Sequence, residues 1–319
     1  MKKLLLAGLL GALLAGPAMT GAASAATIGV TMAQFDDNFL TVLRNGMIDY
    51  AKTVPDTTLQ VEDAGDDVNK QLSQIQNFAA SKVDAIIVNP VDTDATAAMS
   101  KLAADANIPL VYVNRQPVNL DTLPANQSFV GSNETDSGTL EAKQVCKLLK
   151  GAGKGSGADI YIIEGKLDNQ SARQRTQDVH DVIGTPDCSF MKVIDQQTAN
   201  YQRDQAQSLM ANWLTAGTKF DAVVSNNDEM AIGAIQAMKA AGMDTKSVII
   251  GGIDATQDAL ASMKAGDLKV TVFQDAAGQG KGAVDTALAL TKGQKVEKAV
   301  WVPFQLVTPE NMDQYMSKN

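Results

Sequence analysis

Short apolar segments alternate with longer amphipathic segments along most of the chain. A short apolar run that stops at a polar residue is typical of a buried parallel strand, and a longer run with helical spacing is typical of a helix. The strands predicted in this way span 27–32, 58–63, 84–90, 109–115, 128–133, 158–165, 190–196, 222–224, 247–254, 268–275 and 299–307. The predicted helices cover 39–51, 67–81, 93–106, 201–216 and 278–291, with others ending at Lys150, passing through Arg173 and Arg175, and starting at Asp228.

Strands that alternate with helices of this length predict parallel βαβ units. We assign 26–131 with 275–304 to an N-terminal lobe and 132–274 with 305–319 to a C-terminal lobe, so the chain crosses between lobes near Gly131, Gln274 and Gln305. The sequence therefore predicts an α/β fold of two doubly wound, Rossmann-like parallel-sheet lobes joined by a three-segment hinge. A short helix is expected after Pro309.

Polar side chains end several of the predicted strands, where open α/β sheets bind their ligands. These residues are Asn114, Arg115, Asn227, Asp254 and Gln274. Each one alone is equally well explained as a turn residue or a helix cap, and Asp228 is predicted to cap the helix that follows Asn227. Together they favour a binding site for a polyhydroxylated neutral ligand, because amide, carboxylate and guanidinium groups pair with hydroxyl groups.

The segment FDDNF follows the first predicted strand. Asp36 and Asp37 could simply cap the next helix. Phe35 and Phe39 beside them place aromatic faces next to carboxylate acceptors, which is also how a site covers the apolar faces of a polyol. Asn89, by contrast, precedes a proline, and we interpret it as a turn residue.

The N-terminus has the three parts of a secretory signal. Lys2 and Lys3 precede an apolar run, and small residues end the segment at Ala25. A membrane anchor is the alternative, but the apolar run is shorter than the roughly 20 residues that span a bilayer. We predict that 1–25 is a cleaved signal peptide and that the mature protein is exported to the periplasm.

Charge and cysteine content narrow the possible partners. Loss of Lys2 and Lys3 takes the formal net charge from −9 to −11, so an acidic chain without a basic run is a poor candidate for nucleic acid. Cys146 and Cys188 are the two cysteines. In an oxidising compartment they could form a disulfide, and the alternative is two unpaired thiols.

Groups suited to catalysis, metal binding or phosphate binding are scarce. His180, the single histidine, lies in a polar helical segment and is typical of an exposed side chain. GAGKGSG lacks the Ser or Thr that a phosphate-binding loop needs after its lysine, because Lys154 is followed by Gly155. No metal-ligand spacing or nucleophile elbow is present. We therefore expect no catalytic residue, metal or cofactor.

Several segments match a known family in order and spacing. They are NPVDTDA, ANIPLVYVNRQ, SARQR, SNNDEMAIGAIQAM, GGIDATQDAL and VTVFQDAAGQG. In these segments the chain resembles the periplasmic sugar-binding proteins of ABC importers, of the ribose- and galactose-binding type, over the whole mature length. The resemblance implies the type I periplasmic-binding fold with a ligand cleft between the lobes. It also implies ligand contacts from Phe39, Arg115, Arg175, Tyr201, Asn227, Asp254 and Gln274.

The chain departs from the ribose binders at Asn114, where they have Asp, and at FDDNFL, where they have NNPFF. FDDNFLTVLRNGM, NQSARQRTQDVHDVI, QTANYQ and WVPFQLVTPEN are most similar to the myo-inositol-binding branch. The resemblance thus implies a monomeric protein that captures myo-inositol and delivers it to an ABC permease in the inner membrane, with a chemoreceptor as a further partner. Ribose, galactose or another monosaccharide is the alternative ligand.

Two other classes of protein are alternatives. Transcriptional regulators share this two-lobed fold, but they need a DNA-binding helix-turn-helix before Thr27, where the secretion signal lies. An exported hydrolase or isomerase could use Asp36, Asp37 and Asp254 as acids, and turnover of the bound polyol would reveal it. The lack of a catalytic constellation favours a binding protein.

Overall fold

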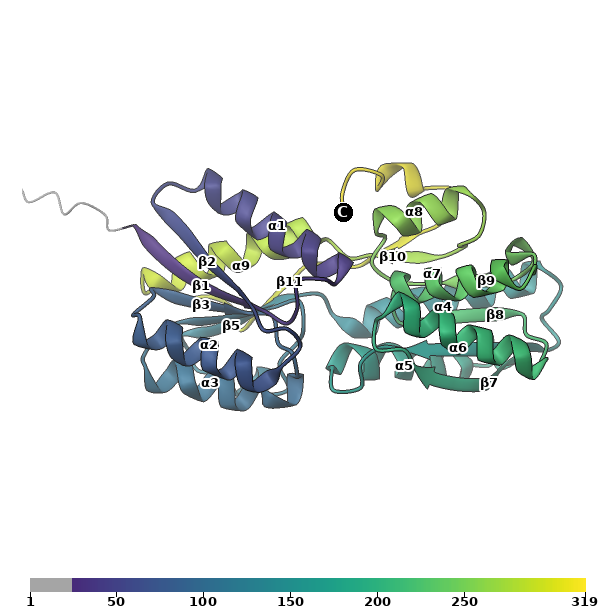
Figure 1. Ribbon diagram of the computed structural model, residues 1–319, viewed down its shortest axis with the longest axis horizontal. Helices are drawn as coiled ribbons and strands as arrows, with labels where there is room; N and C mark the ends of the chain where they lie inside the picture. Colours follow the sequence, from purple (N-terminus) through teal and green to yellow (C-terminus); the bar gives the residue numbers. More distant parts are fainter. Residues whose placement is uncertain (1–24) are drawn as a thin grey trace, which may run out of the picture.

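The computed structural model describes residues 25–319, which form two lobes side by side (Figure 1). The predicted signal peptide, residues 1–25, lies outside the described residues except for Ala25. Within 25–319, no helix is both long and apolar enough to cross a bilayer.

The first lobe is built on a parallel sheet of six strands. Their spatial order is β11 (Ala299–Trp301), β5 (Gln127–Gly131), β4 (Leu110–Val113), β3 (Ala85–Val88), β1 (Ala26–Met32) and β2 (Thr57–Asp63). α1 (Asn38–Thr53) and α9 (Ala276–Thr291) pack on one face, and α2 (Val68–Ala80) and α3 (Thr96–Asp105) pack on the other (Figure 1). α2 approaches β1 so closely that a Cβ atom on Gly29 would lie 2.5 Å from the Phe78 ring.

The second lobe has a parallel sheet of four strands. Their order is β7 (Met191–Thr198), β6 (Ala158–Glu164), β8 (Ala222–Ser225) and β9 (Ile249–Gly251). α4 (Glu134–Gly151) and α5 (Gln170–Ile183) cover one face, whereas α6 (Arg203–Ala216), α7 (Asp228–Ala240) and α8 (Gln257–Lys264) cover the other. The β10 (Thr271–Phe273) and β12 (Gln305–Val307) strands pair antiparallel beside this sheet. Both lobes thus have the expected α/β architecture, with apolar parallel strands between helical layers.

The chain passes between the lobes at three places. These are the links from β5 to α4, from β10 to α9 and from β11 to β12. The prediction of one strand over 299–307 is wrong, because β11 pairs with β5 in the first lobe and β12 pairs with β10 in the second. Pro303 lies between them and has no N–H to continue a ladder. The tail contains the short 3₁₀ helix η4 (Met312–Gln314).

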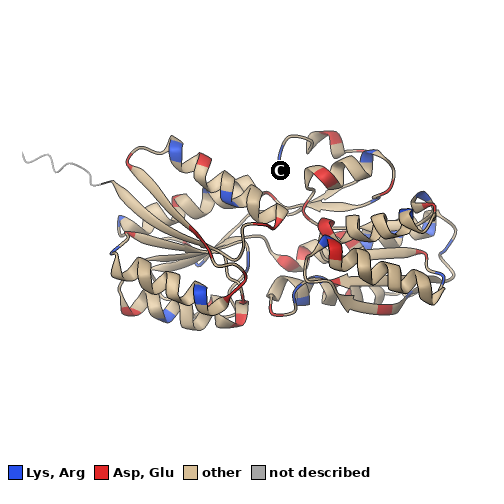
Figure 2. Cartoon of the chain, viewed as in Figure 1, with Lys and Arg blue, Asp and Glu red and all other residues tan. Residues whose placement is uncertain are grey.

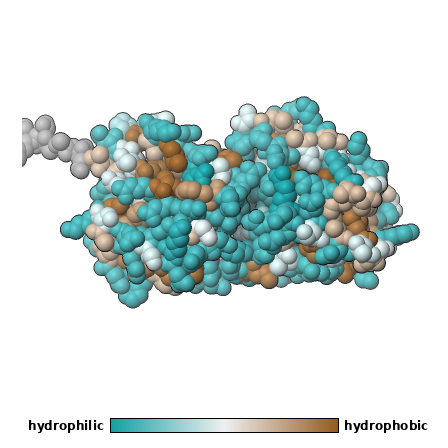
Figure 3. Space-filling view, in the orientation of Figure 1, coloured by the Kyte–Doolittle hydropathy of each residue, from teal (hydrophilic) through white to brown (hydrophobic). Residues whose placement is uncertain are grey.

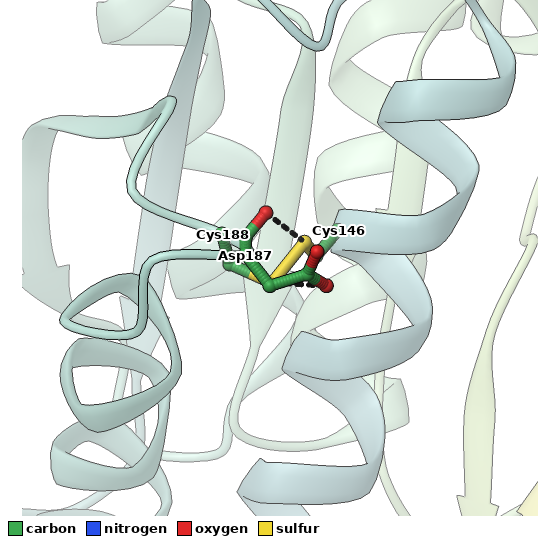
Figure 4. A group of neighbouring side chains, drawn as sticks. All are labelled: Cys146, Asp187 and Cys188. Carbon is green, nitrogen blue, oxygen red and sulfur yellow. Dashed lines mark hydrogen bonds between the residues drawn. A yellow bond between two sulfur atoms is a disulfide. The ribbon is translucent and has the colours of Figure 1, made fainter.

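A disulfide joins Cys146 on α4 to Cys188 in the link before β7, with an S–S distance of 2.12 Å (Figure 4). Asp187 lies beside the two sulfur atoms, and among residues 25–319 these three are the only cluster with metal-ligand spacing. Because both sulfurs are bonded to each other, they are not available as thiolate ligands.

Candidate ligand-binding site between the lobes

A cavity lies between the two lobes, where the surface is hollowed between them (Figure 3). Its empty volume is about 370 Å³, including its open mouth. The first lobe contributes Asp37, Phe39, Leu40, Asn114 and Arg115, and the second contributes Glu134, Ser171, Arg175, Tyr201, Asn227, Asp254 and Gln274. Figure 2 shows acidic segments at the ends of the lobes that face each other.

Asp37 reaches the cavity because it caps α1. Its backbone is extended, and its Oδ1 accepts a hydrogen bond of 2.8 Å from the N–H of Leu40. This satisfies one of the free N–H groups at the start of the helix and turns Phe39 and Leu40 into the cavity. Burial raises the pKa of Asp37, while the Leu40 N–H and the charge of Arg115 act in the opposite direction.

Asn114 and Arg115 follow β4 and form the rest of the cavity wall that the first lobe provides, here called the first wall. Asn114 has a left-handed φ of 68°, which Asn tolerates better than most residues. Its Nδ2 donates to Gln279, and its Oδ1 accepts from Asn89. Arg115 donates from Nη1 to the carbonyl of Pro90 at 2.8 Å. Within residues 25–319 its Nε and Nη2 have no hydrogen-bond acceptor, so they are free to donate into the cavity.

Arg175, from α5, is the central cation of the cavity wall that the second lobe provides, here called the second wall. It forms a two-pronged ion pair with Glu134, with Nε–Oε2 at 2.7 Å and Nη2–Oε1 at 3.1 Å. Nη1 donates to the carbonyl of Asn226 at 2.7 Å, and Nη2 also approaches Oε1 of Gln274 at 3.4 Å. Both charged side chains are almost fully buried. Burying a charge is costly unless it is paired and hydrogen-bonded, and this pair meets both conditions.

Asp254 and Gln274 present groups that the protein leaves unsatisfied. The Asp254 carboxylate is 4% exposed and accepts no hydrogen bond from the described residues. Burial raises its pKa well above the ordinary value, an effect that Arg175 opposes and Asp228 reinforces. Gln274 is 1% exposed, and its Nε2 has no partner within the described chain. Buried polar groups without partners are rare, so an acceptor and a donor here point to a ligand.

Asn227 has two roles at the start of α7. Its Oδ1 caps the helix by accepting from the N–H of Met230 at 3.0 Å, and its side chain also lines the cavity. The prediction that Asp228 caps this helix is therefore wrong. Asp228 lies inward instead, where it accepts from the Thr271 hydroxyl and the Thr256 N–H. Through these two hydrogen bonds, the Asp228 carboxylate connects the start of α7 with the starts of α8 and β10.

Tyr201 closes the second wall as an aromatic face. Its hydroxyl lies 3.0 Å from the Ser171 hydroxyl, and its ring packs directly on Gly165. A Cβ atom at Gly165 would come within 2.2 Å of the ring, so this position needs glycine. An aromatic face is suited to covering the C–H groups of a ring-shaped polyol.

The structure brings nine of the eleven predicted ligand-binding residues around one cavity. Phe35 and Asp36 are the exceptions, because the structure does not place them at the cavity, and their role in ligand binding stays a prediction. The Phe35 ring lies under the Arg44 guanidinium, 4.2 Å from its carbon, and packs on the core of the first lobe. Asp36 is exposed and borders an outer depression, because the cap geometry of Asp37 turns its neighbour outwards.

Three lining residues were missed by the sequence analysis. Ser171 belongs to the SARQR motif, which could have indicated it, and Leu40 belongs to the apolar face of α1. Glu134 lies in the first turn of α4, where an acidic residue usually only favours the helix dipole and faces solvent. Its burial depends on Arg175, which is 41 residues away in the sequence.

The arrangement can bind a compact ligand that carries many hydroxyl groups. Both walls offer charged donors, the second also offers a free carboxylate and amide, and Phe39 and Tyr201 supply aromatic surface. Each hydroxyl both donates and accepts, and leaving one unpaired on burial costs about 1 to 3 kcal/mol. A mixed set of donors and acceptors on both walls meets this requirement.

Comparisons with known proteins agree with this geometry. Residues 28–295 match the model of a periplasmic binding protein domain. The chain is 62% identical over 298 residues, 93% of its length and 95% of the other, to a Rhizobium meliloti protein named "Putative rhizopine-binding protein". An ABC transporter solute-binding protein from Bacillus halodurans C-125 with bound myo-inositol superposes with a TM-score of 0.86 and 40% identity, covering 94% of this chain and all of that one. A Caulobacter myo-inositol-binding protein, bound to myo-inositol, superposes with a TM-score of 0.82 and 27% identity, over 94% of this chain and all of that one.

Proposed function

The chain belongs to the periplasmic binding protein family, and we propose that it captures a polyol, with myo-inositol as the leading ligand, between its two lobes. Its general class is that of a periplasmic sugar-binding protein of an ABC importer, which is a receptor and not an enzyme. The proposal adds the ligand and the residues that hold it.

One observation carries the proposal. The cavity between the lobes gathers Arg115 from one wall with Arg175, Asp254 and Gln274 from the other, and several of their hydrogen-bonding groups have no partner within residues 25–319. Groups of this kind on both walls suit a ligand with hydroxyls around its whole edge. A cyclitol fits this description, since it has neither a ring oxygen nor a reducing end.

The expected affinity follows from ligand size. A polyol of about a dozen heavy atoms, at roughly 0.7 to 1 kcal/mol per atom, binds with a Kd in the micromolar to nanomolar range. The ligand favours the closed arrangement of the lobes because only that arrangement allows both walls to contact it. The closed form is then the one that an ABC permease recognises. We propose that the protein acts as a monomer and that a chemoreceptor can also bind the closed form.

A rhizopine is the second candidate ligand, favoured by the 62% identity with the Rhizobium meliloti protein. The charges of the cavity add a physical reason to include amine-bearing cyclitols among the ligands tested. Three carboxylates, from Asp37, Glu134 and Asp254, line the cavity with two guanidinium groups. Since Glu134 and Arg175 pair with each other, two carboxylates face a single remaining cation.

The test is a calorimetric titration of mature protein that has been unfolded, freed of carried-over ligand and refolded. The titrants are myo-inositol, an aminated cyclitol, D-ribose, D-galactose and D-glucose. Tight binding of myo-inositol with no heat from the aldoses supports the proposal. Tight binding of the aminated cyclitol alone favours the second candidate. Tight binding of an aldose with no heat from either cyclitol would keep the transport role and reject the proposed ligand class.

A further inference from the structure

Arg175 is contacted by residues from all three links between the lobes. Glu134 begins α4, three residues after Gly131 ends β5 at the first link. Gln274 follows β10 at the second link, and its Oε1 lies 3.4 Å from Nη2 of Arg175. Phe304 lies between β11 and β12 at the third link, with its ring centre 6.0 Å from the guanidinium carbon. A side chain that lines the cavity is thus in contact with the whole hinge.

Glu134 makes the strongest of these contacts. Its carboxylate holds Nε and Nη2 of Arg175 at 2.7 and 3.1 Å and also accepts from the Ser137 hydroxyl at 3.0 Å. Both oxygens are therefore occupied within the protein. The carboxylate is also placed at the N-terminal end of α4, where the helix dipole favours a negative charge.

The hydrogen-bond donors of Arg175 show what this contact achieves. A guanidinium group has five N–H donors in a fixed plane. One from Nε and one from Nη2 go to Glu134, the second from Nη2 approaches Gln274, and one from Nη1 goes to the carbonyl of Asn226. Among the described residues no acceptor takes the second N–H on Nη1, which is left for a ligand. Its direction is set by the four bonds that hold the plane.

We propose that Glu134 is a positioning residue, which fixes the plane of Arg175 for the ligand and couples ligand capture to closure of the lobes. This inference rests on the proposed function. Closure changes the backbone at the three links, and the contacts of Arg175 with Glu134, Gln274 and Phe304 are compatible with only some arrangements of those links. A ligand bound to Arg175 therefore favours the arrangement in which all of these contacts form.

A simpler role would be charge neutralisation, in which Glu134 only offsets the buried charge of Arg175. Two substitutions separate the roles. Glu134→Asp keeps the charge but shortens the side chain by one methylene, so the carboxylate no longer reaches both nitrogens. Glu134→Gln keeps the length but replaces one acceptor oxygen with a donor. Positioning predicts a defect in both variants, whereas neutralisation predicts a defect only in Glu134→Gln.

Glu141→Gln is the matched control. Glu141 lies two turns along the same helix, is fully buried, and has no hydrogen bond to Arg175. Its Oε1 accepts from the N–H of Ser225 at 3.1 Å, and it does not line the cavity. The substitution therefore repeats the chemical change on α4 without touching the guanidinium.

The experiment combines calorimetry with small-angle X-ray scattering, using myo-inositol or whichever cyclitol the wild type binds. The wild type and Glu141→Gln are expected to bind alike and to contract alike at saturating ligand. Glu134→Asp and Glu134→Gln are expected to bind at least about 30-fold more weakly and to contract less at saturation. A variant whose only defect is a less stable lobe would still contract as much as the wild type at saturating ligand.

Each outcome supports or overturns the inference. If both Glu134 variants match Glu141→Gln in affinity and contraction, the inference is overturned while the proposed function stands. The inference is also overturned if Glu134→Asp behaves like the wild type and only Glu134→Gln is defective. If Glu134→Gln does not fold, Glu134→Asp decides alone. A wild type that binds no polyol overturns the proposed function and this inference with it.

Discussion

The two walls of the cavity are held in place by different kinds of interaction. The first wall is supported by a chain of uncharged groups, in which Asn89 donates to Asn114, Asn114 donates to Gln279, and Gln279 donates to the Ser132 hydroxyl. Gln279 lies on α9 and Ser132 in the link from β5 to α4, so this chain runs from the cavity side of the first lobe to two of the links.

The second wall is supported by buried charges. Arg175 and Glu134 form its ion pair, and the same lobe also buries the carboxyl groups of Glu141, Asp178 and Asp228. Asp254 adds a carboxylate with no partner among the described residues. Removing one member of an uncharged, buried chain costs about 1 to 3 kcal/mol, whereas removing one partner of a buried ion pair leaves an uncompensated charge and costs about 3 to 5 kcal/mol. The comparison therefore predicts that affinity and pH dependence are determined mainly by the second wall.

The largest effect is expected from Arg175→Ala. The substitution removes the charged group that we propose donates a hydrogen bond to the ligand, and it leaves Glu134 buried without its partner. We expect the affinity for myo-inositol to fall by about 100-fold or more, because the lost hydrogen bond from a charged group contributes about 1.5 to 3 kcal/mol and the unpaired, buried Glu134 carboxylate disturbs the same wall. Calorimetry measures the affinity, circular dichroism checks that the variant is folded, and Gln177→Ala, an exposed site on the same helix, is the control. Unchanged affinity in the folded variant would refute the role of Arg175.

Asp254→Asn is expected to separate binding from stability. The variant loses a carboxylate acceptor, so affinity should fall by about 10- to 100-fold. Because burial raises the pKa of Asp254, burying this carboxyl group lowers the stability of the ligand-free fold at neutral pH, and the uncharged amide removes that effect. The ligand-free variant should therefore melt at the same temperature as the wild type or higher. A lower Tm together with unchanged affinity would mean that Asp254 is structural.

Gln279→Ala tests the uncharged hydrogen-bond chain that supports the first wall. Gln279 is fully buried and joins Asn114 to Ser132, so its loss should cost about 1 to 3 kcal/mol of unfolding free energy. The affinity should fall by less than about tenfold, because Asn114 keeps its contact with Asn89. Urea unfolding and calorimetry give the two quantities. An affinity loss as large as that of Arg175→Ala would contradict the difference between the walls.

The smallest effect on binding is expected from Asp178→Asn, which tests the pH dependence of the second lobe. Burial raises the pKa of Asp178 to about 7, with Glu134 and Asp181 adding to the rise and the bond from Gln174 opposing it. A carboxyl whose pKa is higher in the folded state favours folding below its unfolded pKa, and this contribution is lost as the pH rises from about 4 through about 7.

At pH 8 the Asp178→Asn variant should therefore be more stable than the wild type by about 1 to 3 kcal/mol, and the difference should disappear near pH 4. Urea unfolding at the two pH values measures this difference. Asp228, whose pKa burial also raises to about 7, keeps part of the pH dependence in the variant. A variant with the wild-type stability at both pH values would show that Asp178 does not titrate in this range.

The sequence predicted the elements that depend on local pattern. Apolar runs such as those of β4 and β8 are buried on both faces, so they stand out without any knowledge of the fold. Residues that end such runs, including Asn114 and Asn227, could be placed at the cavity because parallel strands present their carboxyl ends at one edge.

The remaining features depend on contacts between distant segments. Glu134 is buried only because Arg175 lies against it, and no pattern within α4 indicates this. Asp36 and Asp37 are chemically alike, and only the cap geometry of α1 decides which one faces the cavity. The division of 299–307 into two strands depends on which lobe each half meets, although Pro303 marks where the ladder must stop.

The most direct test of ligand capture between the lobes is a crystal structure of the mature protein grown with myo-inositol. We predict one inositol molecule in the cavity, with hydroxyls hydrogen-bonded to Asn114 and Arg115 on one wall and to Arg175 and Asp254 on the other. An inositol molecule held by one lobe alone, or bound outside this cavity, would contradict capture between the lobes.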